Sequence, residues 1–77
     1  MNATVMTLAR YHALKAVKAA VLRNQGHRGL REMQSAELTR LATAHLTAHP
    51  EIVVRARKIV RDDPALRRMA ERHGSLQ

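Results

Sequence analysis

A chain of 77 residues suffices for one small domain, and a formal net charge of +8, from 14 Lys and Arg against six Asp and Glu, makes it strongly basic. It contains no cysteine, which excludes a disulfide framework, a thiolate nucleophile and a cysteine-based zinc site. Phe and Trp are also absent, so the single Tyr cannot provide the several stacking rings on which single-strand-binding and RNA-reading modules depend.

The first predicted element is a long helix over residues 6–23, a segment rich in the strong helix formers Ala, Leu and Lys. At about 100° per residue, one apolar stripe forms along this helix. The stripe consists of Tyr11, Leu14, Val17 and Val21. A different face carries Lys15 and Arg23, and no acidic residue precedes Glu32, so the helix is amphipathic with a basic side.

Residues 24–34 are predicted to form a long loop, because a cluster of Asn, Gln and two Gly interrupts the helical pattern. Within it, the four residues from Gly26 to Gly29 resemble the GxxG loop of KH domains, which clamps a nucleic-acid backbone. The resemblance covers this loop alone, because a KH domain needs a three-stranded sheet and no strand is predicted here. We therefore interpret Gly26 as a helix C-cap and Gly29 as a turn residue.

Three shorter helices are expected to start near Ser35, Pro50 and Pro64. Ser35 is interpreted as the N-cap of a helix over 36–48, and Pro50 as the first residue of a helix that reaches about 62. Asp63 is interpreted as the N-cap of the last helix. Gly74 is expected to end that helix and to leave residues 74–77 as a frayed tail.

These elements predict a single all-α domain over residues 1–77, a small bundle of three to four helices with a long first helix. Thirteen of its apolar residues are alanines, so its core is expected to be thin. Self-association or docking on a partner is then expected to add stability.

The basic charge predicts a small, non-enzymatic nucleic-acid-binding or nucleic-acid-associated regulatory protein, because Arg and Lys bind phosphate oxygens and release counterions. Half of the phosphate contacts are expected from the first 31 residues and half from the third helix. They are Lys15, Arg23, Arg28, Arg31, Arg55, Arg57, Lys58 and Arg61. The sequence does not distinguish DNA from RNA as the partner.

The second and third predicted helices, joined around His49 and Pro50, also resemble a helix-turn-helix, which would make the third helix the recognition helix. Leu46 stands where that motif expects a glycine, so an ordinary helical hairpin is the other interpretation.

Catalysis, cofactors and a small-molecule substrate are not expected, because no nucleophile–base pattern, phosphate-binding loop or dinucleotide fingerprint occurs. His45 and His49 have the i, i+4 spacing of two metal ligands, but no third ligand is evident and no metal is expected.

A protein-interaction module, such as an inhibitor, adaptor, accessory subunit or homo-oligomer, is the alternative function. Surface apolar residues such as Val54 and Leu30 would then contribute more to binding than the arginines.

Membrane binding is not expected, since no apolar run approaches the roughly 18–20 residues of a membrane span. The acid-free start also resembles a transit peptide, but a cytoplasmic location is the interpretation adopted.

Overall fold

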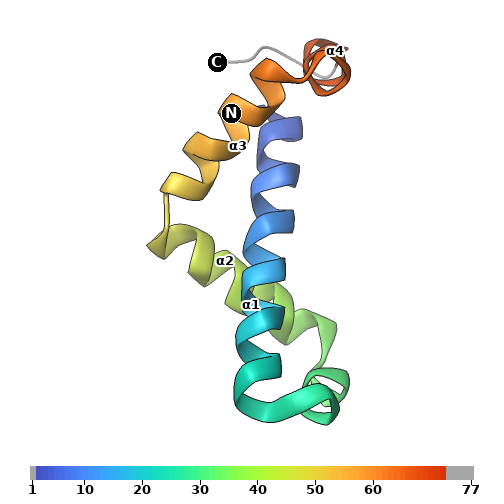
Figure 1. Ribbon diagram of the computed structural model, residues 1–77, viewed down its shortest axis with the longest axis vertical. Coiled ribbons are helices and arrows are strands. Elements are labelled where there is room, and N and C mark those ends of the chain that lie inside the picture. The colour runs from blue at the N-terminus through green and yellow to red at the C-terminus, as the bar shows by residue number, and fades with distance from the viewer. Residues whose placement is uncertain (1, 73–77) are drawn as a thin grey trace.

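The computed structural model describes residues 2–72, which form four helices and contain no strand. The helices are α1 (Ala3–Glu32), α2 (Ser35–Ala48), α3 (Glu51–Asp62) and α4 (Pro64–Arg72). The all-α class and the bundle with a long first helix are therefore confirmed. The bundle is elongated, at 40 × 20 × 19 Å, and α1 runs along its longest axis (Figure 1). The expected frayed tail at 74–77 lies outside the described residues.

The packing face of α1 follows a ridge of small residues. Its buried positions recur at every fourth residue: Val5, Ala9, Ala13, Val17 and Val21. Because a helix turns about 100° per residue, this ridge rotates by roughly 40° at each step. The helices packed along α1 therefore meet different sides of it. The predicted stripe was wrong at Tyr11, whose side chain is 55% exposed, because close packing occurs over alanines and not over the largest apolar side chain.

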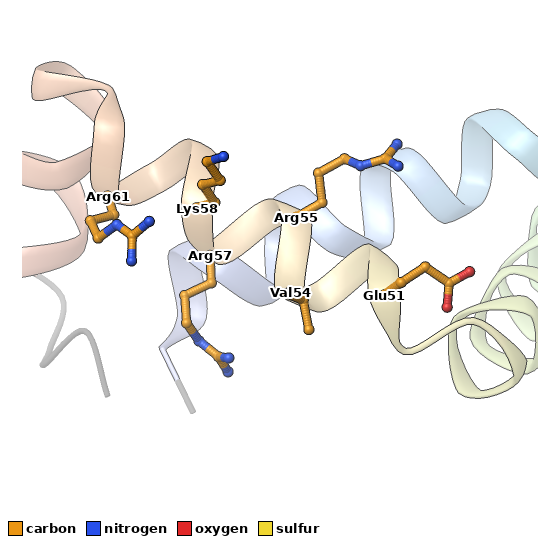
Figure 2. Close-up of a pocket in the computed structure, with 6 residues that line it drawn as sticks. All are labelled: Glu51, Val54, Arg55, Arg57, Lys58 and Arg61. Atoms are coloured by element: carbon orange, nitrogen blue, oxygen red, sulfur yellow. The ribbon is translucent and has the colours of Figure 1, made fainter.

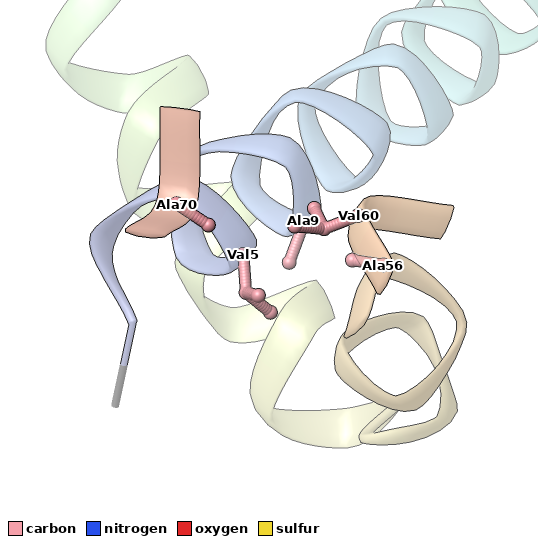
Figure 3. Close-up of a cluster of buried hydrophobic side chains, with 5 residues drawn as sticks. All are labelled: Val5, Ala9, Ala56, Val60 and Ala70. Carbon is pink, nitrogen blue, oxygen red and sulfur yellow. The ribbon is translucent and has the colours of Figure 1, made fainter. Parts of the chain in front are cut away.

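The core divides into two clusters along α1, and its buried hydrophobic residues are all Val or Ala. The first cluster joins the N-terminal part of α1 to α3 and α4 (Figure 3). It consists of Val5, Ala9, Ala56, Val60 and Ala70. The second cluster joins the middle of α1 to Ala42 of α2. Leu46 packs against both clusters, while α2 and α3 pack mainly on α1 and scarcely on each other.

Asn2 fastens the N-terminus of α1 to the end of α4. Its Oδ1 accepts hydrogen bonds from the backbone N–H groups of Thr4 (2.9 Å) and Val5 (3.4 Å), which makes it the N-cap of α1. Its Nδ2 donates to the carbonyl oxygen of Ala70 at 3.3 Å. Ala70 lies near the C-terminal end of α4, so this hydrogen bond joins the start of the first helix to the last helix. Asn2 is only 4% exposed, and its role was not predicted from the sequence.

The long loop predicted over residues 24–34 is wrong, because α1 continues to Glu32 and only Met33 and Gln34 connect it to α2. The break in direction is made at Gly26 alone, which has φ 75° and ψ −178°, a conformation that is essentially restricted to glycine. The turn beyond it is helical and carries an ion pair between Arg28 and Glu32 at 3.0 Å. Leu30 packs against the second cluster there, so it is not the free surface residue that was expected.

The starts of the other helices agree with the sequence to within one residue. Ser35 is the first residue of α2 and Gln34 is its N-cap, which corrects the assignment of Ser35 as the cap. Pro50 is likewise the N-cap of α3 and not its first residue. The start of α4 at Pro64 is confirmed, with Asp63 Oδ1 accepting from the N–H groups of Ala65 (2.9 Å) and Leu66 (3.1 Å).

Candidate nucleic-acid interface

Four of the eight predicted phosphate-binding residues lie together on α3. They surround a shallow surface hollow of about 500 Å³, which Val54 and Glu51 also line (Figure 2). The four are Arg55, Arg57, Lys58 and Arg61. They share the outer surface of α3 because Ala56 and Val60 are buried against α1, with Ile52 and Val53 packed beside them. A single short helix thus carries the whole cluster, which we name the α3 cationic face.

The cations of this face have few partners of their own. Arg61 Nε lies 3.5 Å from Asp62 Oδ1, and both side chains are exposed, so this ion pair is weak and exchangeable. Arg57 is half-buried, and its Nε has no hydrogen-bond partner among the described residues. Arg55 and Lys58 have no carboxylate within ion-pair distance in that part of the chain. The exposed Arg55 guanidinium and Lys58 ammonium are therefore available to an external anion, whereas the Nε of Arg57 is itself buried.

Glu51 is the one acidic residue in the hollow, at the first turn of α3. A hydrogen bond from its own backbone N–H at the start of α3 lowers the pKa of Glu51. The neighbouring His49, whose Nδ1 lies 3.1 Å from Glu51 Oε1, and the charge of Arg55 lower that pKa further. Glu51 is therefore ionised at neutral pH and opposes the cationic face. Its place in the hollow was not predicted from the sequence, although its i, i+4 spacing to Arg55 was a signal of their proximity.

The other four predicted residues lie on α1 and do not join this cluster. Lys15 is exposed, and its Nζ lies 5.5 Å from the centre of the Tyr11 ring. Arg23 lines a separate hollow between α1 and α2. Arg28 and Arg31 follow the kink at Gly26, and this last segment of α1 lies at the opposite end of the long axis from α4 (Figure 1). On the α1 side, His12 and Ala16 share a small hollow with Arg55.

The two glycines of the GxxG pattern shape the kink and do not form a loop. Gly26 supplies the backbone conformation, whereas Gly29 lies within the helical turn that follows. A Cβ at Gly29 would collide with the Cβ of Gln25, so the close approach of the chain across the kink needs glycine there. The spacing that resembled a KH loop is thus explained by the path of α1.

The helix-turn-helix interpretation is also not supported, because its two helices should pack on each other and α2 and α3 scarcely do. Where α2 meets α3, the ring centres of His45 and His49 lie 4.3 Å apart. Among residues 2–72, no group of three or more His, Asp or Glu side chains is arranged to hold a metal ion.

We found no match to this chain among protein-family models, curated proteins or solved structures. None of the helices in the described part of the chain combines the length and the apolar character that crossing a bilayer requires.

Proposed function

We propose that this chain is a small, non-enzymatic nucleic-acid-binding protein that contacts phosphates through the α3 cationic face. The observation that carries the proposal is that four cations line one hollow, in which Glu51 is the only acidic lining residue. A phosphate backbone supplies the oxygens that these donors lack, and the counterions it releases favour binding.

The charge balance of the whole molecule supports the same partner. Four arginines pair with a carboxylate on a neighbouring residue or turn, which leaves ten of the 14 Lys and Arg without one among residues 2–72. Like charges at this density repel one another and oppose the compact state. A polyanion relieves that repulsion, so binding and stability should rise together.

The exposed apolar side chains argue against the alternative, a module that binds proteins through an apolar surface. The largest of them come from three helices: Tyr11, Leu22, Val54, Ile59 and Met69. Val54 and Ile59 lie about 140° apart around α3, and Tyr11 and Leu22 lie three turns apart on α1. Scattered single residues of this kind are ordinary surface and do not form an interface.

The test is fluorescence-anisotropy titration of random-sequence duplex DNA between about 50 and 200 mM salt. Four phosphate contacts predict a slope of log K against log salt of about −3.6 and a loss of affinity of roughly 150-fold over that range. Eight contacts, with the α1 residues included, would double the slope. Binding that hardly changes with salt would refute the proposal.

Charge-matched variants locate the contacts. Lys58→Gln should weaken binding and reduce the slope by about 0.9, because it removes one phosphate contact. Arg40→Gln removes the same net charge from α2, where the side chain is paired with Glu37 at 4.0 Å, and should have little effect. Glu51→Gln should strengthen binding, because it removes the repelling charge from the hollow. Equal effects of Lys58→Gln and Arg40→Gln would mean that the α3 cationic face is not the site.

A further inference from the structure

The exposed side of α3 has a central row of side chains with an arginine on either side of it. At about 100° per residue, Val54, Lys58 and Arg61 lie within roughly 60° of one another, on the side opposite the buried Ala56. Arg55 and Arg57 lie about 70–90° to either side of that centre. Figure 2 shows these two arginines extending in opposite directions from the helix. The outer surface of α3 is thus a ridge with a guanidinium on each side.

The same surface lacks the groups that recognise unpaired bases. The sequence of α3 contains no aromatic residue and no Asn or Gln. Binding of single strands relies on aromatic rings on which successive bases stack. The one Tyr of the chain lies on α1, and the hollow on α3 is lined only by charged side chains and Val54. A partner of this face should therefore present its phosphates and keep its bases paired.

A helix with cations on both flanks matches a groove that has phosphates on both walls. The major groove of B-form DNA is about 12 Å wide and admits one α-helix, whereas that of A-form RNA is deep and too narrow for side chains to read. The 12 residues of α3 span about 18 Å, and Val54, at the centre of the ridge, is 62% exposed.

We propose, as an extension of the function proposed above, that α3 binds in the major groove of duplex DNA. In this arrangement Arg55 and Arg57 contact phosphates of opposite strands. Val54 faces the base edges, where it can contact the 5-methyl group of thymine. Lys58 and Arg61 continue the phosphate contacts along the groove.

The first experiment compares duplex DNA, duplex RNA and single-stranded DNA of one sequence and length with the full chain by anisotropy. The duplexes carry equal numbers of phosphates and differ in groove shape, so duplex DNA should bind at least about tenfold more tightly than either other probe. If all three bind equally, with steep salt dependence and loss on Lys58→Gln, the groove inference is overturned and phosphate binding stands. If none binds, both proposals fall.

The second experiment tests the contact of Val54 with the bases. Replacing every thymine of an A·T-rich duplex by uracil removes only the 5-methyl groups and should weaken binding of the native chain about fourfold. In Val54→Ala this difference should disappear, whereas Met69→Ala, at an exposed apolar residue of α4, should retain it. An absent uracil effect, or one that persists in Val54→Ala, would overturn the proposal.

Discussion

Asn2 should contribute more to stability than an N-cap alone, because it bonds to a residue of another helix that is 68 positions away in sequence. Asn2→Ala removes the cap of α1, which is worth about 1 kcal/mol. It also removes the buried hydrogen bond to the Ala70 carbonyl, at a further cost of about 1–2 kcal/mol. The expected loss in free energy of unfolding is therefore about 2–3 kcal/mol.

The chain supplies a matched control in Asp63, the N-cap of α4. Its Oδ1 accepts from two backbone N–H groups, as Asn2 Oδ1 does, but the residue is exposed and its side chain makes no hydrogen bond to another helix within residues 2–72. Asp63→Ala should therefore cost only about 1 kcal/mol. Thermal and urea unfolding followed by circular dichroism measures the difference, because each kcal/mol shifts the Tm of a domain of this size by about 4–8 °C.

Asn2→Asp separates the two roles of the side chain. It keeps a good N-cap but replaces the donor to Ala70 with a carboxylate oxygen, so it should recover the cap and not the bond between helices. Equal losses for Asn2→Ala and Asp63→Ala, or full recovery in Asn2→Asp, would refute this reasoning.

Three further predictions concern the core, the kink and a titrating group. Val60→Ala should cost about 2 kcal/mol in chemical denaturation, because Val60 is fully buried, whereas Val54→Ala on the exposed side of α3 should change stability by less than about 0.5 kcal/mol. Gly26→Ala should cost about 1–3 kcal/mol by the same measurement, since the φ of 75° strains any L residue; unchanged stability would contradict the kink. The lowered pKa of Glu51 means that its carboxylate stabilises the fold above the unfolded pKa, and that this contribution is lost as pH falls through the folded pKa. Glu51→Gln should therefore lower the Tm at pH 7 and match the native chain in acid; a difference that persists in acid would contradict this.

The sequence predicted the features that depend on neighbouring residues. The start of α4 follows from Asp63 and Pro64 alone, and the α3 cationic face follows from the spacing of four cations on one helix. Both depend only on local periodicity and helix capping, which neighbouring residues determine without any contact from elsewhere in the chain.

The features that were missed depend on partners distant in sequence. The packing ridge of α1 runs through Ala9 and Ala13, whose small size lets another helix approach, whereas the predicted stripe gave weight to the large side chain of Tyr11. The kink at Gly26 was interpreted as the start of a loop, because the packing of Leu30 that holds the following turn in place is tertiary. The bond from Asn2 to Ala70 could not be inferred from either residue.

The division of the core into two clusters has a consequence for how this molecule unfolds. Among residues 2–72, α1 and Leu46 are what the two clusters share, so packing couples the α2 half to the α3–α4 half through them. Amide hydrogens in the middle of α1 should then exchange most slowly, since they are exposed only when both halves open. Truncating the Leu46 side chain, as in Leu46→Ala, should weaken that coupling, so that either half can unfold while the other remains folded.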